Sequence, residues 1–189
     1  MTRLCLALTC ALLAGALVSN AAEPAKPGKV DIGRKAPAFQ IKDAKGKLID
    51  LAKLTDKGPV LVRLTCGCSG CDKELAYFQK IHEAYKDQGL QSLLIFKEPD
   101  AKMAKYAQDK KLNMLYAVDP KGVSWTVFQT KAMPANFLIE KGGKIVSIAT
   151  GCDPSGILAN KVSQKAAKTL GKKAVDVKKQ VEKAKSSSK

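Results

Sequence analysis

Three cysteines, at positions 66, 68 and 71, lie within six residues, and no other part of the sequence is as well suited to chemistry. An apolar, β-branched run at residues 60–65 precedes them, and a helical pattern begins near Asp72. If Cys68 ends the strand-to-helix loop, its sulfur lies at the amino end of that helix, where free N–H groups and the helix dipole favour a thiolate. Cys71 is then a second thiol one turn away, close enough to attack a mixed disulfide. The spacing predicts a redox-active Cys68/Cys71 pair.

Clustered cysteines have two other common uses. A buried cysteine can act as a small hydrophobic residue, and several together can bind a metal ion. Neither use explains why these cysteines lie between a strand and a helix. A structural zinc site usually needs a second ligand pair, and the only distant ligands available are His82 and Cys152. We therefore expect no metal site and no cofactor other than the redox-active disulfide itself.

The first residues have the pattern of a secretory signal peptide, which we place at residues 1–21. Arg3 supplies a positive start, residues 4–18 are apolar, and small residues follow. The apolar part is short for a membrane span, so a retained anchor is the weaker alternative. Because Cys5 and Cys10 lie in this segment, four cysteines remain for the mature chain. We expect a periplasmic or otherwise exported protein, in a compartment where disulfide chemistry persists.

The rest of the chain divides into a linker at residues 22–30, one domain at residues 31–170 and a lysine-rich tail at residues 171–189. The domain is long enough to bury a sizeable core. The net charge is +16, and residues 161–189 hold ten lysines against two acidic residues, so ten minus two, or +8, lies at this end. We expect the tail to be a solvated, partly frayed helix. Weak contact with an anionic surface is the minor alternative, and no specific nucleic acid is expected.

The apolar periodicity within the domain predicts alternating strands and helices. The expected elements are a hairpin of residues 36–41 and 48–51, strands at 60–65, 93–96, 113–118, 135–140 and 145–148, and helices at 72–88, 100–111 and 154–170. The strand–helix–strand order after residue 60 predicts a right-handed parallel crossover. We expect Asp100 to cap one helix and Gly171 to end another. Arg63, inside a buried strand, needs a partner or an edge position.

This pattern resembles the thioredoxin superfamily, above all the exported thiol–disulfide oxidoreductases and AhpC/TSA-related redoxins that are similar to TlpA and ResA. The resemblance spans roughly residues 31–170. The motifs that carry it are Ala36-Pro37-x-Phe39, Cys68-Ser69-Gly70-Cys71, Glu74, Met133-Pro134 and Gly142-Gly143-Lys144-Ile145-Val146. It implies an α/β, thioredoxin-like fold, in which a mixed central sheet has helices on both faces and follows an N-terminal β-hairpin.

The resemblance also implies a role for each matching residue. Cys68 would be the exposed nucleophile and Cys71 the buried resolving thiol. Pro134 would be a cis-proline beside the disulfide, with the backbone around Met133 binding an extended substrate. Glu74 would relay the proton of Cys71, although a helix-surface charge is the simpler interpretation. The protein would then be an enzyme acting on protein or small thiol and disulfide substrates, with an unidentified redox partner.

Two features depart from the family pattern. Gly67 replaces the usual aromatic residue before the nucleophile, and Ser69-Gly70 lacks the proline often found inside the motif. Because this dipeptide strongly affects the redox potential, the direction of electron flow is not predicted. Cys66 is an extra thiol without a family role. We treat Cys66 and Cys152 as structural or accessory thiols and hypothesise a bridge between them.

Two other functions remain open. The spacing Thr65-x-x-Cys68 resembles that of peroxiredoxins, which would make Cys68 a peroxidatic cysteine, but Leu61 replaces the proline that they place before the threonine. The chain could instead be a copper-binding metallochaperone, since clustered thiols are soft ligands for Cu(I). A copper-binding redoxin would be expected to add a well-placed histidine, whereas His82 lies on the helix, off its apolar face.

Overall fold

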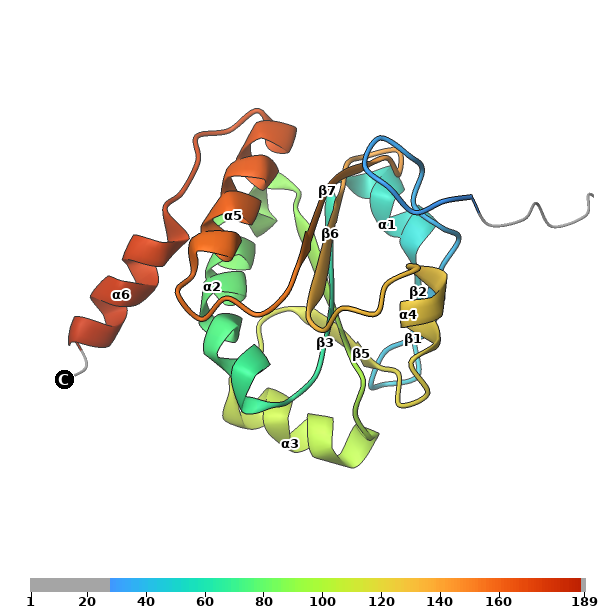
Figure 1. The fold of residues 1–189 in the computed structure, drawn as a ribbon, viewed down its shortest axis with the longest axis horizontal. Helices are drawn as coiled ribbons and strands as arrows, with labels where there is room; N and C mark the ends of the chain where they lie inside the picture. The colour runs from blue at the N-terminus through green and yellow to red at the C-terminus, as the bar shows by residue number, and fades with distance from the viewer. Residues whose placement is uncertain (1–27, 188–189) are drawn as a thin grey trace, which may run out of the picture.

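A five-stranded mixed sheet forms the centre of the structure (Figure 1). The computed structural model describes residues 28–187, so the predicted signal peptide and most of the predicted linker lie outside the described residues. The strands are β3 (Val60–Thr65), β4 (Gln91–Phe96), β5 (Leu115–Val118), β6 (Ala135–Ile139) and β7 (Ile145–Thr150). Their order across the sheet is β5-β4-β3-β6-β7, with β3 parallel to β4 and antiparallel to β6. The strand that leads to the cysteines is therefore the central one.

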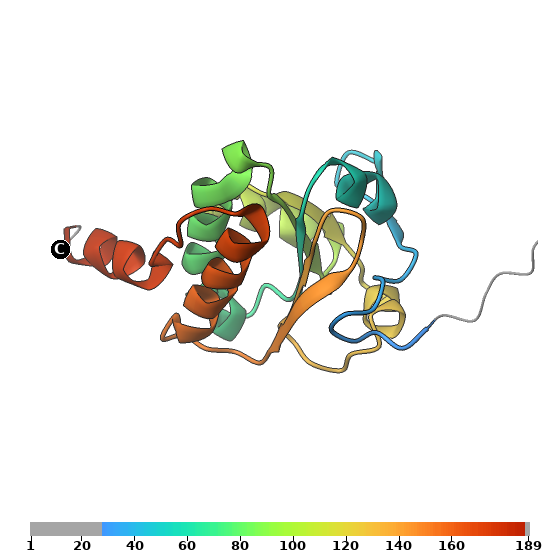
Figure 2. The same ribbon diagram turned by 90° about the horizontal axis from the view of Figure 1, so that it is seen from above.

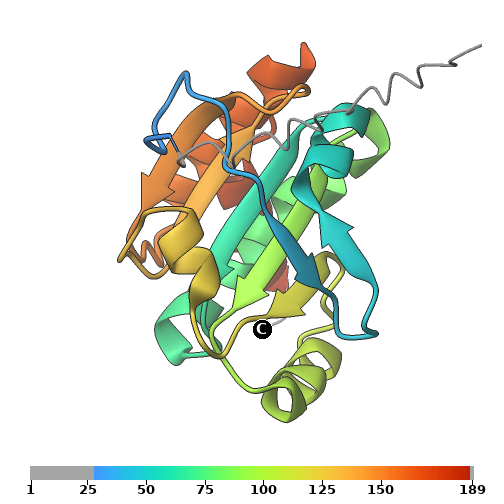
Figure 3. The same ribbon diagram turned by 90° about the vertical axis from the view of Figure 1, so that its right-hand side faces the viewer.

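Helices cover both faces of the sheet (Figures 1 and 2). One face holds α2 (Ser69–Tyr85), α3 (Asp100–Asp109) and α5 (Ile157–Leu170), and the 3-10 turn η1 (Lys86–Gln88) continues α2. The other face, toward the viewer in Figure 3, holds α1 (Leu51–Lys57), α4 (Val123–Val127) and the hairpin of β1 (Gln40–Lys42) and β2 (Leu48–Asp50). The predicted fold, a mixed sheet with helices on both faces and an N-terminal hairpin, is confirmed.

The side chains of β3 divide between two hydrophobic cores, one on each face of the sheet. Leu61 belongs to the core beneath α2, while Val62 and Leu64 belong to the core beneath α1 and α4. This alternation is the period of two that a strand requires. Four apolar residues at helical spacing on α2 are all buried: Leu75, Phe78, Ile81 and Tyr85.

The predicted elements are found with shifted boundaries. β3 and β4 are parallel and joined by α2, as the crossover prediction requires, and β6 and β7 form the predicted antiparallel hairpin. Gly171 ends α5 in a left-handed conformation, as expected. The prediction that Asp100 caps α3 is wrong. The cap position is occupied by Pro99, which makes no side-chain cap hydrogen bond, and Asp100 is the first helical residue.

The lysine-rich end of the chain is more ordered than the sequence predicts. Residues 177–187 form α6 (Val177–Ser187), which lies against α2 and α5 (Figure 1). Val177 and Val181 are buried, and the Tyr85 hydroxyl accepts a hydrogen bond from the Val175 N–H at 2.8 Å. The expectation of a solvated, frayed helix is therefore wrong, because two valines and one tyrosine hold the segment. Neither α6 nor any other helix among residues 28–187 has the length and apolar character to cross a membrane.

Candidate active site

Cys68 lies where the central strand gives way to a helix. β3 ends at Thr65 and α2 begins at Ser69, so Cys68 is the N-cap residue of α2, with an extended backbone and an exposed side chain. Its pKa is lowered to about 7, first by a hydrogen bond from the Cys66 thiol and then by bonds from backbone N–H groups that include those of Cys71 and Gly70. The structure thus places Cys68 at the amino end of a helix, as predicted, and its role as the reactive thiolate stays a prediction.

The sulfur atoms of Cys66, Cys68 and Cys71 lie within 4.8 Å of one another. Cys66 Sγ is 2.9 Å from Cys68 Sγ and 3.4 Å from Cys71 Sγ. Cys71 is buried in the first turn of α2, whereas Cys66 is half-buried. Burial and the neighbouring thiols raise the pKa of Cys66 to about 12, so Cys66 keeps its proton and donates it toward the Cys68 thiolate. No specific role for Cys66 follows from the sequence, but the structure places it inside the cluster.

Cys152 approaches the same loop from the edge strand β7. It follows β7, and its thiol donates to the Gly70 carbonyl oxygen at 3.2 Å. Its pKa is raised by burial first and by Glu74 next. The four described cysteines are free thiols, and Cys66 contacts Cys68 and Cys71. The hypothesised Cys66–Cys152 bridge is thus not the arrangement in this structure.

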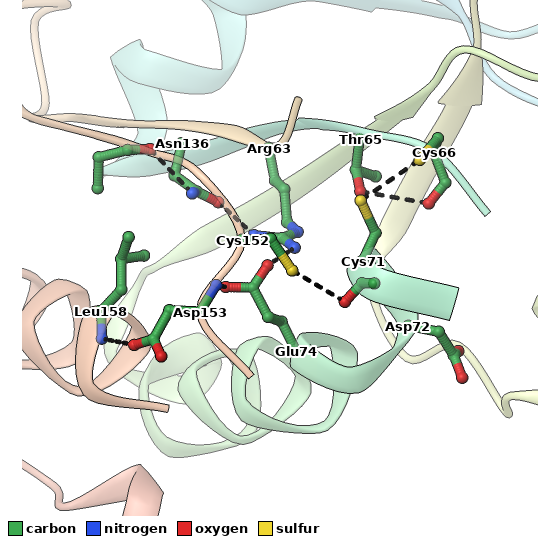
Figure 4. Close-up of polar contacts among 12 residues, drawn as sticks. Arg63, Thr65, Cys66, Cys71, Asp72, Glu74, Asn136, Cys152, Asp153 and Leu158 are labelled. Carbon is green, nitrogen blue, oxygen red and sulfur yellow. Dashed lines mark hydrogen bonds and ion pairs between the residues drawn. The ribbon is translucent and has the colours of Figure 1, made fainter. Parts of the chain in front are cut away.

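A buried polar network lies beneath the cysteines (Figure 4). Arg63, in the middle of β3, forms an ion pair with Glu74 at 2.8 Å and donates to the Asn136 Oδ1 at 2.8 Å. Its guanidinium also stacks 4.0 Å from the centroid of the Phe78 ring. The other carboxylate oxygen of Glu74 accepts the Asp153 N–H at 2.8 Å. Arg63 therefore has the partner that its buried position required, and Glu74 is not a helix-surface charge.

Asp153 links this network to α5 (Figure 4). Its carboxylate accepts hydrogen bonds from the Ser155 side chain and from the Leu158 N–H at 2.6 Å. These two bonds, that of Ser155 first, lower the pKa of Asp153. The segment that carries Cys152 is thereby fixed to α5 on one side and to Glu74 on the other. Because the Glu74 oxygens bond to Arg63 and to the Asp153 backbone, proton transfer from Cys71 to Glu74 stays a prediction.

The peptide bond between Met133 and Pro134 is cis, as the resemblance implied. β6 starts at the next residue, Ala135, which pairs with Leu64, so Pro134 lies beside Thr65 at the end of β3. Met133 is exposed, and it lines a groove of about 540 Å³. The remaining lining residues are Lys97, Lys121, Gly122, Trp125, Thr126, Gln129, Thr130 and Lys131.

The groove lies at the same end of the sheet as the cysteines. The Lys97 N–H donates to the Thr65 carbonyl oxygen at 3.0 Å, so Lys97 and Pro134 flank the end of β3 on its two sides. Three lysines make the groove positively charged. Sequence reasoning missed these lysines because they come from three separate loops and no local pattern connects them.

His82 is distant from the cluster. His82 lies on α2, fourteen residues after Cys68. At the usual rise per residue, the two residues are about 20 Å apart along the helix axis. It is half-buried, and its Nδ1 is 3.2 Å from the Ser92 hydroxyl. His82 therefore cannot bind the same metal ion as the three cysteines.

The fold is similar to that of a solved thiol:disulfide interchange protein. A solved structure from Chlorobium tepidum, a candidate thiol:disulfide interchange protein DsbE, has a TM-score of 0.68 and 24% sequence identity, and the match covers 75% of this chain and 99% of that chain. This fold, together with the match of the AhpC/TSA family model and the similarity to ResA, makes the protein a redoxin of the thioredoxin superfamily and an oxidoreductase.

The sequence comparisons define the family more closely. The thiol-disulfide oxidoreductase ResA of Bacillus anthracis is 30% identical over 124 residues, which cover 65% of this chain and 72% of ResA. ResA of Bacillus subtilis is 28% identical over 151 residues, which cover 79% of this chain and 83% of ResA. The model of the AhpC/TSA family matches residues 32–148, more than half of the chain. The chain belongs to the AhpC/TSA family, and the resemblance drawn from its motifs is confirmed.

Proposed function

We propose that this protein catalyses thiol–disulfide exchange, with Cys68 as the nucleophile and Cys71 as the resolving thiol. The observation that carries the proposal is the contrast between the two cysteines: Cys68 is exposed and has a pKa of about 7, while Cys71 is buried in the next turn of the same helix. A partly ionised, accessible thiol can attack a disulfide, and a protected neighbour can complete the exchange. The relatives named ResA, which are thiol-disulfide oxidoreductases, support the same reaction.

In the first step, the Cys68 thiolate attacks one sulfur of a substrate disulfide. A bond forms between Cys68 Sγ and that sulfur, the substrate disulfide breaks, and the other substrate sulfur leaves as a thiolate. In the second step, Cys71 loses its proton and attacks Cys68 Sγ, which releases the second substrate thiolate. Two electrons pass to the substrate, the two thiolates take up protons, and a Cys68–Cys71 disulfide remains. The reverse steps oxidise a dithiol, and neither direction needs an organic cofactor.

The substrate would bind across the end of the sheet. We propose that an extended protein segment, or a small disulfide, lies along the backbone at Met133 and Pro134, with its charged groups in the lysine-lined groove. The three lysines of this groove favour substrates with acidic groups near the disulfide. A separate redox partner, not identified, would reduce or oxidise the Cys68/Cys71 pair after each exchange.

The location follows from the amino-terminal sequence and is likewise a proposal. We propose that residues 1–21 direct export to the periplasm or another exported compartment and are then removed. Cell fractionation with amino-terminal sequencing of the recovered protein tests this, and a cytoplasmic product that keeps its leader would contradict it. A weak contact between the lysine-rich α6 and an anionic surface is part of the same proposal, and vesicle binding that disappears at high salt would support it.

Disulfide mapping and insulin reduction together test the proposed reaction. The Cys68→Ser variant should lose insulin-reducing activity, because no other exposed cysteine in the described residues has a lowered pKa. The Cys71→Ser variant should accumulate a mixed disulfide between Cys68 and the substrate. Cys152→Ser should remain active and serves as the matched control. Peptide mapping of the oxidised protein should find the Cys68–Cys71 bond, and a predominant Cys66–Cys68 bond would contradict the assignment of Cys71.

Peroxide reduction is the second candidate, because the AhpC/TSA family model matches and Cys68 is an exposed thiol with a lowered pKa. The position of Thr65 argues against it, since its hydroxyl donates to the Cys66 carbonyl oxygen at 3.4 Å rather than to Cys68. Stopped-flow mixing of the reduced protein with hydrogen peroxide separates the two. Consumption as slow as that by a free thiol would exclude the peroxidase.

A further inference from the structure

We propose that the reduced protein binds one Cu(I) ion through the sulfur atoms of Cys66, Cys68 and Cys71. These three sulfurs already lie within 4.8 Å of one another, on one six-residue stretch that leads from β3 into the first turn of α2. Disulfide exchange by Cys68 and Cys71 needs only two of them. The third thiol, Cys66, gives the cluster the composition of a soft metal site.

The distances fit a three-coordinate site with small adjustments. Three thiolates around one ion with metal–sulfur bonds of about 2.3 Å have sulfur–sulfur separations of about 4 Å. The present separations are 2.9 Å for Cys66–Cys68 and 3.4 Å for Cys66–Cys71. A shift of about 1 Å in the exposed Cys68 side chain opens the first pair to that value, and rotation of Cys66 opens the second.

The donor set favours Cu(I) over zinc. Thiolates alone select soft ions, and Cu(I) accepts two or three of them, whereas structural zinc requires four ligands. The nearest further thiol, Cys152, donates to the Gly70 carbonyl oxygen, and His82 lies about 20 Å along α2. Among the described residues, the cysteine cluster is therefore complete for Cu(I) and one ligand short for zinc.

Binding would exchange protons for the metal ion. One Cu(I) and three thiols give a complex with a net charge of −2, with no electron transferred and up to three protons released. The N–H groups and dipole of α2 favour the resulting negative charge. Apparent affinity should therefore rise with pH.

The site and the disulfide exclude each other. A Cys68–Cys71 disulfide removes two of the three ligands, so the oxidised protein should not hold the ion. A bound ion, conversely, blocks attack by Cys68. The metal proposal does not depend on the exchange reaction, because a chain that binds no copper can still exchange disulfides.

The test is an anaerobic competition for Cu(I) between the reduced full chain and the chromogenic chelator bicinchoninate. Cys5→Ser and Cys10→Ser are present throughout, so that only the four cysteines of the described residues can bind. One Cu(I) per chain should leave the chelator. Cys66→Ser should weaken binding by roughly 100-fold or more, because loss of a direct ligand exceeds the effect of losing an outer-shell partner. Cys152→Ser is the matched control and should bind like the parent.

Two outcomes would overturn the proposal: no transfer of Cu(I) to the parent, or equal affinity in the parent and in Cys66→Ser. X-ray absorption of the loaded parent provides a second measurement that does not depend on the variant folding. It should show three sulfur neighbours, and two neighbours would contradict the three-thiolate site. Insulin reduction by the same Cys66→Ser protein, without copper, separates a failure of the metal site from a failure of the exchange reaction.

Discussion

Arg63 and Glu74 form an ion pair across the inside of the molecule, with Arg63 Nη2 2.8 Å from Glu74 Oε2 and both side chains almost completely buried. One residue comes from the central strand that leads to the cysteines, and the other comes from the helix that contains Cys71. Arg63 also donates a hydrogen bond to the side-chain oxygen of Asn136, and Glu74 also accepts one from the Asp153 N–H. The relative position of strand and helix beneath the three thiols therefore depends on a polar network rather than on apolar packing alone.

Replacing Glu74 with glutamine should destabilise the protein strongly. The change leaves the buried Arg63 charge without its counter-charge, for which a loss of about 3–5 kcal/mol in the free energy of unfolding is typical. The double variant Arg63→Leu/Glu74→Leu should lose less than the sum of the single variants, since it leaves no unpaired charge. Urea unfolding of the reduced proteins measures these differences. A Glu74→Gln protein as stable as the parent would show that the pair contributes little.

The same variant tests whether Glu74 relays the proton of Cys71. If it does, the release of substrate from the mixed disulfide should become slower in Glu74→Gln and lose part of its pH dependence. If Glu74 acts only through the ion pair, the folded fraction should resolve the mixed disulfide with the pH profile of the parent. Single-turnover kinetics, corrected for the folded fraction, distinguish the two results.

The reactivity of Cys68 should follow a thiolate with a pKa of about 7. Its alkylation by iodoacetamide should rise with pH and level off above that value, because only the ionised form attacks. Replacing Cys66 with alanine removes the largest stabilising hydrogen bond, so the pKa of Cys68 should rise by about 1–2 units, the equivalent of one bond to a charged group. Alkylation at pH 7 should then become slower. Peptide mass spectrometry after timed quenching measures the alkylation of Cys68 separately from that of the other cysteines.

Cys152→Ala is the control for this shift. Its thiol bonds to the Gly70 carbonyl oxygen and not to the Cys68 sulfur, so its removal should leave the Cys68 profile nearly unchanged. An equal shift in both variants would mean that the general environment of the loop, rather than the Cys66 thiol, lowers the pKa.

The lysine-lined groove should determine charge preference among substrates. The double variant Lys121→Glu/Lys131→Glu should raise KM about tenfold for a disulfide peptide with acidic flanks, because each exposed charge contributes up to about 1 kcal/mol. The effect should decrease with added salt. Lys141→Glu lies beyond the opposite end of β6 and is the matched control. Equal KM values for acidic and basic peptides in the parent would remove the groove from substrate binding.

The last helix should contribute to stability. Val181→Ala removes buried apolar surface between α6 and the rest of the first core and should lower the free energy of unfolding by about 1–2 kcal/mol. Lys183→Ala, on the exposed side of the same helix, should change it by less than about 0.5 kcal/mol. Urea unfolding compares the two, and an unchanged midpoint for Val181→Ala would indicate that α6 detaches in solution.

The sequence was sufficient for features that depend on neighbouring residues. The strand that ends before Cys66 and the apolar face of α2 follow from local periodicity, and the position of Cys68 at a helix amino end follows from them. Features that depend on residues far apart in the sequence could not be predicted from local patterns. Nothing local indicates that Glu74 pairs with Arg63, because the pairing requires the packing of α2 on β3.

The same limit explains the error at the end of the chain. Residues 177–187 contain few apolar side chains, and by themselves they give a polar helix with little to bury. Their docking depends on Tyr85, whose hydroxyl contacts both the Val175 N–H and the Ser163 hydroxyl at 3.1 Å. The cis bond at Pro134 was expected only through the family resemblance, since the residues around it are equally compatible with an ordinary turn.

Gly70 contacts Cys152, which lies 82 residues later in the chain. A Cβ atom at Gly70 would lie 3.5 Å from the sulfur of Cys152, which is ordinary van der Waals contact. Its N–H is also one of the donors that lower the pKa of Cys68, and proline has no such donor. A proline at position 70, common in related motifs, would therefore remove one donor from the Cys68 sulfur and make this thiol less acidic. The glycine thus helps to keep the proposed nucleophile ionised.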